Sequence, residues 1–189
     1  MMRKVIATIL ALLFLVPTMA MAEASTLPFG LSFGMDSEQA KAAFAADPVL
    51  STQKADVSDY GDGAIEYIFE DVPMLQTDVT ATNVSIQIDQ NNSQKADRLS
   101  MVGFTVTPSE NSIVTFRTLL KALTATLGAP DDDPFSTESA DMYVEWGTLY
   151  ASWTLPEARV QLNLNRMYSE SITLQYNARL NYDKADLAE

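Results

Sequence analysis

Apolar and polar residues alternate along most of the chain between residues 144 and 177. Successive residues of a β-strand point to opposite faces, so this alternation predicts strands that bury one face and present the other to water. Antiparallel sheets are built in this way. The predicted inward-facing residues are Val144, Trp146, Leu149, Ala151, Trp153, Leu155, Val160, Leu162, Leu164, Ile172, Leu174 and Tyr176.

Three more strands are predicted in the first half of the chain, where apolar residues alternate at 65–69, 84–88 and 102–106. The polar segment 89–93 separates the last two of these and predicts a hairpin loop. The segment 51–63 is polar and rich in turn-forming residues, and we interpret it as a connection.

A first helix is predicted from Asp36 onward. Asp36 can cap the helix, Gln39 stands three residues later as in a capping box, and Asp47-Pro48 ends the segment. A second helix has the same kind of start, with Thr107 as the cap and Glu110 completing the capping box. Its apolar stripe is Ile113, Phe116, Leu120, Leu123 and Leu127, and it is predicted to end at Gly128.

The predicted order is helix, three strands, helix, then three or four strands. This order indicates an α+β fold with two helices packed on an antiparallel sheet. We expect a single domain over residues 23–182, followed by a charged tail at 183–189. Its two parts, 30–106 and 107–182, are similar in length, which raises the possibility of an internal duplication.

The N-terminus has the three parts of an export signal. Arg3 and Lys4 are basic, residues 5–16 are uncharged and apolar except for Thr8, and Ala20-Met21-Ala22 supplies the small residues that a signal peptidase reads. We therefore expect residues 1–22 to be a signal peptide that is cleaved before Glu23. The alternative is a retained membrane anchor, but the break at Pro17 favours cleavage.

The chain contains no Cys and no His. Without Cys there is no disulfide and no lipid attachment at the cleavage site, which is typical of a bacterial periplasmic protein; release to the medium is the alternative. Serine and cysteine triads that use His are excluded, as are the common zinc, copper and haem ligand sets. We therefore expect no enzyme activity, no metal and no cofactor.

The charge is strongly acidic, with 12 Lys and Arg against 25 Asp and Glu. Removing Arg3 and Lys4 leaves a net charge of −15 on the predicted mature chain. Such a surface repels phosphate backbones and anionic headgroups, so we expect neither a nucleic-acid partner nor binding to a membrane surface. Once residues 1–22 are cleaved, we expect no membrane span.

Amides and hydroxyls fill the outward positions of the last two predicted strands. Neutral hydrogen-bonding groups can bind sugar hydroxyls or peptide backbone without the desolvation cost of charges. An ordinary solvated sheet face is the simpler explanation of the same pattern. The candidate binding residues are Gln161, Asn163, Asn165, Thr173, Gln175 and Asn177.

Acidic residues offer three weaker candidates. The run Asp131 to Asp133 and the segment Asp59 to Glu66 could supply oxygen ligands to a cation, although neither has the spacing of a known calcium loop. Glu145 and Glu157 lie near Trp146 and Trp153, and paired carboxylates near aromatic rings are typical of glycosidases. We interpret these residues as solvated side chains and the tryptophans as core.

Two short motifs carry a family resemblance. The segment 33–38 (FGMDSE) and the helix end at 127–130 (LGAP) resemble small bacterial exported α+β domains of the β-lactamase-inhibitor-protein-like and outer-membrane-assembly-lipoprotein-like types. The resemblance implies a scaffold that binds other proteins. The chain departs from the lipoproteins because it lacks the lipidated Cys.

Two functions are therefore predicted, in order of preference. The first is a non-catalytic periplasmic scaffold that binds an envelope protein. The second is a module that binds carbohydrate or another envelope polymer through the amide-rich face.

Overall fold

The computed structural model describes residues 27–60, 63–91, 96–108, 111–135, 147–166 and 170–179. The described elements are two helices, seven strands and two short 3-10 turns. In chain order they are η1 (Pro28–Gly30), α2 (Ser37–Ala46), η2 (Leu50–Thr52), β1 (Asp56–Asp59), β2 (Ala64–Pro73), β3 (Thr80–Asn91), β4 (Ala96–Val106), α3 (Ser112–Leu127), β5 (Thr148–Thr154), β6 (Ala158–Asn165) and β7 (Ser171–Ala178).

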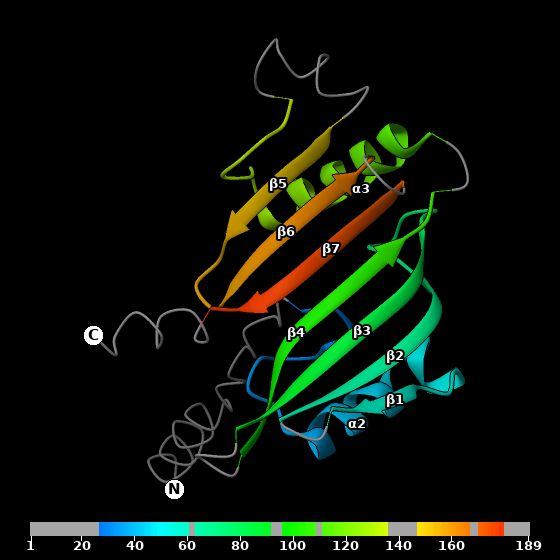
Figure 1. The fold of residues 1–189 in the computed structure, drawn as a ribbon, viewed down its shortest axis with the longest axis vertical. Helices are drawn as coiled ribbons and strands as arrows, with labels where there is room; N and C mark the ends of the chain where they lie inside the picture. The colour runs from blue at the N-terminus through cyan, green and yellow to red at the C-terminus, as the bar shows by residue number, and fades with distance from the viewer. Residues whose placement is uncertain are drawn as a thin grey trace, which may run out of the picture.

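The strands form one antiparallel sheet in the order β1-β2-β3-β4-β7-β6-β5 (Figure 1). The last strand before α3 therefore pairs with the last described strand, and this pair lies at the centre of the sheet. The predicted α+β class, with two helices and an antiparallel sheet, is confirmed.

The described apolar residues that are predicted to face inward lie on one face of the sheet. A single row of buried side chains crosses the sheet from β2 to β5, because each residue pairs with the next: Tyr67, Ile86, Val102, Tyr176, Val160 and Trp153. Both helices pack on this face, α2 through Phe44 and α3 through Phe116, Leu119 and Leu123. Burial of this apolar surface is the main stabilising contribution.

Helix α2 begins where the sequence predicts. The side chain of Asp36 accepts a hydrogen bond from the backbone N–H of Gln39 (2.8 Å), and the Gln39 side chain accepts one from the backbone N–H of Asp36 (3.1 Å). The Phe44 ring then meets the rings of Tyr67 and Phe69 at centroid distances of 5.4 and 5.3 Å. The helix is thereby fixed over β2.

Helix α3 begins later than predicted, so Thr107 as its cap is wrong. Asn111 is the cap, and its side chain accepts hydrogen bonds from the backbone N–H groups of Ile113 (3.0 Å) and Val114 (3.4 Å). Thr107 still belongs to the end of the sheet, because its backbone N–H donates to Thr82 Oγ1. Glu110 lies outside the described residues. The predicted end is confirmed, since Gly128 caps the helix with a φ of 89°.

The sheet has one strand more before α3 than predicted. Asp56–Asp59 pairs with β2 as β1, although its segment was interpreted as a connection. Backbone pairing needs no apolar side chain, and β1 is mostly exposed at the edge of the sheet. The predicted hairpin between 84–88 and 102–106 is confirmed by the pairing of β3 with β4, but residues 89–91 of the predicted loop continue β3. Val144 and Trp146 lie outside the described residues.

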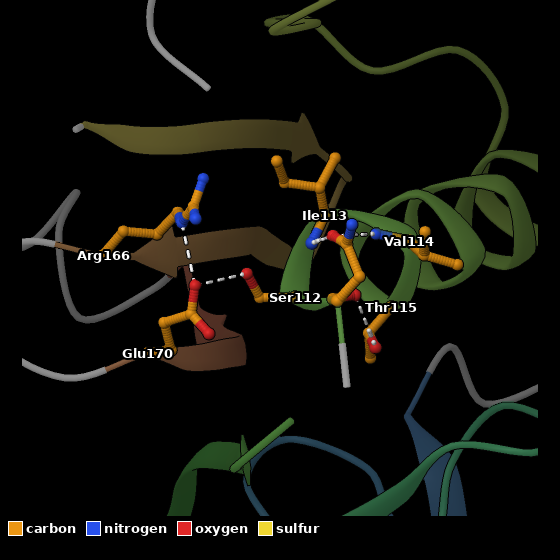
Figure 2. A network of polar contacts seen from close by, with 7 residues as sticks. Ser112, Ile113, Val114, Thr115, Arg166 and Glu170 are labelled. Carbon is orange, nitrogen blue, oxygen red and sulfur yellow. Dashed lines mark hydrogen bonds and ion pairs between the residues drawn. The ribbon is translucent and has the colours of Figure 1, made fainter. Parts of the chain in front are cut away.

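A polar network connects the start of α3 to the segment before β7 (Figure 2). Glu170 Oε1 accepts hydrogen bonds from Ser112 Oγ (3.1 Å) and from Arg166 Nε (3.0 Å). A carboxylate beside the first turn of a helix is favourable, because the unpaired N–H groups there carry partial positive charge. The network positions α3 over β6 and β7.

Within the described ranges, neither helix has the length and apolar character needed to cross a membrane.

Candidate functional site

The face of the sheet opposite the helices is polar and runs across all the strands from β2 to β5. Its central row of paired residues is Ile68, Ser85, Gly103, Gln175, Gln161 and Ser152. We call this row, with the side chains two residues before and after each of its members, the open face. In the described part of the chain, both helices contribute their buried side chains to the other face.

Five of the six candidate binding residues lie on the open face, on β6 and β7, and the sixth, Asn165, lies on the same side of β6 two residues beyond Asn163. Gln161 is paired with Gln175 and Asn163 with Thr173, so these four form a block on adjacent strands. Asn177 is paired with Arg159, and Asn165 with Ser171. All six are half-buried except Asn165, which is exposed. The structure therefore brings together the residues that the sequence selected.

Tyr150 of β5 extends this block, and the sequence analysis did not identify it. Its hydroxyl oxygen accepts hydrogen bonds from Gln161 Nε2 (3.0 Å) and Arg159 Nη2 (3.3 Å). Burial alone raises the pKa of Tyr150, but hydrogen bonding with Ser152 and the hydrogen bonds donated by Gln161 and Arg159 outweigh burial and lower it. The alternation of Tyr150 with the buried residues Leu149 and Ala151 was the signal that could have placed it on this face.

A second cluster lies on the open face at the other end of the sheet. Glu66 of β2 accepts hydrogen bonds from the hydroxyls of Tyr60 (2.6 Å) and Ser85. The hydrogen bond to Glu66 raises the pKa of Tyr60. Both oxygens of this carboxylate thus have a partner within the chain.

The rest of the open face carries few charges. Between Glu66 and Arg159, the paired residues in the same row are Gln87, Met101 and Asn177. The face therefore offers mainly amide and hydroxyl groups. It also carries two carboxylates on β2, Glu66 bonded within the chain and Glu70 exposed, and the guanidinium of Arg159 near the other edge.

In the acidic run 131–133, which is predicted as a possible cation site, Asp131 and Asp132 bond to strand β5. Asp131 Oδ2 accepts from the backbone N–H of Thr154 (2.7 Å), and Asp132 Oδ2 accepts from Ser152 Oγ (2.7 Å). Backbone hydrogen bonds join the same segment to β5, from Asp131 N to Ser152 O (2.7 Å) and from Ser152 N to Asp132 O (3.3 Å). These aspartates therefore cover the outer edge of β5.

The remaining acidic candidates are not brought together. No cluster of three or more acidic side chains suited to a metal ion occurs among the described residues. Glu157 is exposed, and Glu145 and Asp62 lie outside the described ranges. Trp153 is 1% exposed and its indole N–H donates to Gly128 O (2.9 Å), so it belongs to the core as predicted.

No protein-family model, no curated protein and no solved structure matches this chain.

Proposed function

We propose that this chain is an exported, non-catalytic scaffold that binds an envelope protein through the open face. The observation that carries the proposal is the side-by-side arrangement of Gln161, Gln175, Asn163 and Thr173 on the face that the described helices leave uncovered. Amide groups have both donors and acceptors, so such a face can hydrogen-bond to a partner's backbone and side chains. The proposal includes cleavage of residues 1–22 and release into the periplasm.

The size of the open face favours a protein over a small ligand. The six strands of the open face have five spacings of about 4.8 Å, giving a width of about 24 Å, and the seven residues of β5 span about 23 Å. The projected area is about 550 Å², which is a large part of the roughly 800 Å² that each partner buries in a protein complex of standard size.

The second candidate is a module that binds carbohydrate or an envelope polymer. The same amide block supports it, because sugar hydroxyls both donate and accept hydrogen bonds. Sugar-binding faces also use aromatic rings as platforms, and Tyr150 lies beside Gln161 on this face. Trp153 is buried and does not offer its ring as a platform for sugar.

The two candidates are separated by one experiment with a matched control. The mature chain is used to capture proteins from a periplasmic extract and, in parallel, to probe a glycan array. We expect a specific envelope protein to be captured, and to be lost in the double variant Gln161→Ala with Asn163→Ala. The control variant is Thr118→Ala with Thr126→Ala, two exposed hydroxyls of α3 that bond to their own helix. Glycan binding that is lost in the face variant would support the second candidate instead.

We also propose that the fold arose by duplication of a helix followed by a three-stranded meander. Two features support this. The segments β2-β3-β4 and β5-β6-β7 have the same order, and their last strands pair at the centre of the sheet. In addition, Ser85 of β3 reaches Glu66 of β2 much as Gln161 of β6 reaches Tyr150 of β5.

A further inference from the structure

The two edges of the sheet differ. The outer edge of β5 is covered by Asp131 and Asp132, which bond to Ser152 and Thr154. At the other edge, no described strand pairs with the outer side of β1. Exposed strand edges are templates for pairing with another chain, and proteins usually protect them.

The uncovered edge also carries exposed apolar side chains. Val57 and Tyr60 are each 58% exposed, and they are two of the three large apolar side chains that are strongly exposed among the described residues. Val57 is paired with Tyr67, so it lies on the core face of the sheet at its margin. A strand added outside β1 would cover Val57 from the side.

The charges of β1 decide which strand can be added. Asp56 and Asp59 stand at the two ends of β1, with Val57 and Ser58 between them. A second copy would bring two more carboxylates to this edge, and its β1 has no basic side chain to pair with them, so the charges favour a basic strand over self-pairing. A basic side chain at the same positions would form favourable cross-strand pairs.

We propose that the outer edge of β1 accepts an extended basic segment of a partner protein as an additional antiparallel strand. The segment would place Lys or Arg opposite Asp56 and Asp59, and an apolar residue opposite Val57. Backbone hydrogen bonds supply the affinity in this mode of recognition, and the side chains supply the specificity. This edge is separate from the block of amides on β6 and β7.

The test uses a defined peptide, acetyl-Thr-Lys-Thr-Val-Lys-Thr-amide, whose central Lys-Thr-Val-Lys matches β1 in antiparallel register. Binding to the mature chain is followed by NMR titration of the backbone amides. Two control peptides are used. One has Glu in place of both Lys residues, and the other keeps the charges but is N-methylated at alternate backbone positions.

We expect saturable binding at millimolar peptide, with shifts centred on residues 56–60 and on β2. Neither control peptide should bind in this way. The protein variant Asp56→Asn with Asp59→Asn should weaken binding by about three- to tenfold, because two exposed ion pairs are lost. The matched variant Asp78→Asn with Glu157→Gln has the same change of charge at exposed positions elsewhere and should bind as the unmodified chain does.

Three results of the titration would overturn the proposal. They are the absence of binding, equal binding of the N-methylated peptide, and shifts centred away from β1. Equal binding of the N-methylated peptide would mean that the charges alone attract the peptide. Dimerisation of the chain through β1, seen by sedimentation, would also contradict it, because the proposed charge pattern disfavours a second copy. None of these results bears on the open face, so the proposed function is tested independently.

Discussion

Gln161 Nε2 lies 3.0 Å from the hydroxyl oxygen of Tyr150, so a side chain of the central row fixes an aromatic ring on the neighbouring strand. Arg159 donates to the same oxygen at 3.3 Å. These hydrogen bonds fix the side chains of the open face in the unbound protein. A preorganised face loses less conformational entropy on binding.

The pKa of Tyr150 tests this arrangement. We expect the phenol to titrate below its ordinary value of 10.0, because the hydrogen bonds from its neighbours outweigh burial. A pKa that is lower in the folded than in the unfolded chain adds stability above the unfolded value. That contribution is lost as the pH falls through the folded pKa. Titration of ¹³C-labelled tyrosine by NMR, assigned with Tyr150→Phe, measures the value. Gln161→Ala should raise the pKa, and no change in that variant would contradict the assignment.

The link between Trp153 and Gly128 is expected to stabilise the packing of α3 on the sheet. Trp153→Phe removes the donor to the Gly128 carbonyl and some buried volume, and we expect a loss of about 2 kcal/mol in the free energy of unfolding. Urea denaturation followed by circular dichroism measures this change in the free energy of unfolding. Val114→Ala, at a residue that is 61% exposed, is the control and should change stability by less than about 0.5 kcal/mol.

The start of α3 can be tested by two substitutions. Asn111→Ala removes the side chain that caps the helix and should cost about 1 kcal/mol. Thr107→Ala leaves its backbone N–H bonded to Thr82, so we expect little change in stability. Thermal denaturation of both variants distinguishes the two cap positions. A larger loss for Thr107→Ala would place the cap where the sequence alone predicts it.

The covered edge of β5 gives a further prediction. Asp132→Ala leaves the hydroxyl of Ser152, which is 3% exposed, without its acceptor, and we expect a loss of about 1–3 kcal/mol. Chemical denaturation measures this loss, and sedimentation shows whether the freed edge makes the chain self-associate. Glu157→Ala, an exposed residue in the adjoining turn, should have little effect on either measurement. Equal stability of the two variants would mean that Asp132 does not protect the edge.

The local features of the fold could be predicted from the sequence. The alternating residues of β6 and β7 predict which side chains share the open face, because a strand repeats every two residues. The cap at Asp36 and the end at Gly128 depend on neighbouring residues alone. The α+β class follows from these elements together.

Long-range features could not be predicted. The strand order sets Tyr150 beside Gln161 and sets Glu66 and Arg159 in one row, and neither relation is visible in local sequence. β1 has little apolar content and forms through its backbone pairing with β2. At α3, the end of β4 holds Thr107 in the sheet, and Asn111 therefore becomes the cap.

The most direct test of the open face uses the absence of Cys from the chain. A single cysteine at Asn163→Cys carries a photo-crosslinker onto the open face, and one at Thr118→Cys carries the same reagent to the exposed side of α3. Both labelled proteins are irradiated in a periplasmic extract. We expect a specific envelope protein to be crosslinked from Asn163→Cys and not from Thr118→Cys. Crosslinks from Thr118→Cys alone, or none from Asn163→Cys, would contradict binding through the open face.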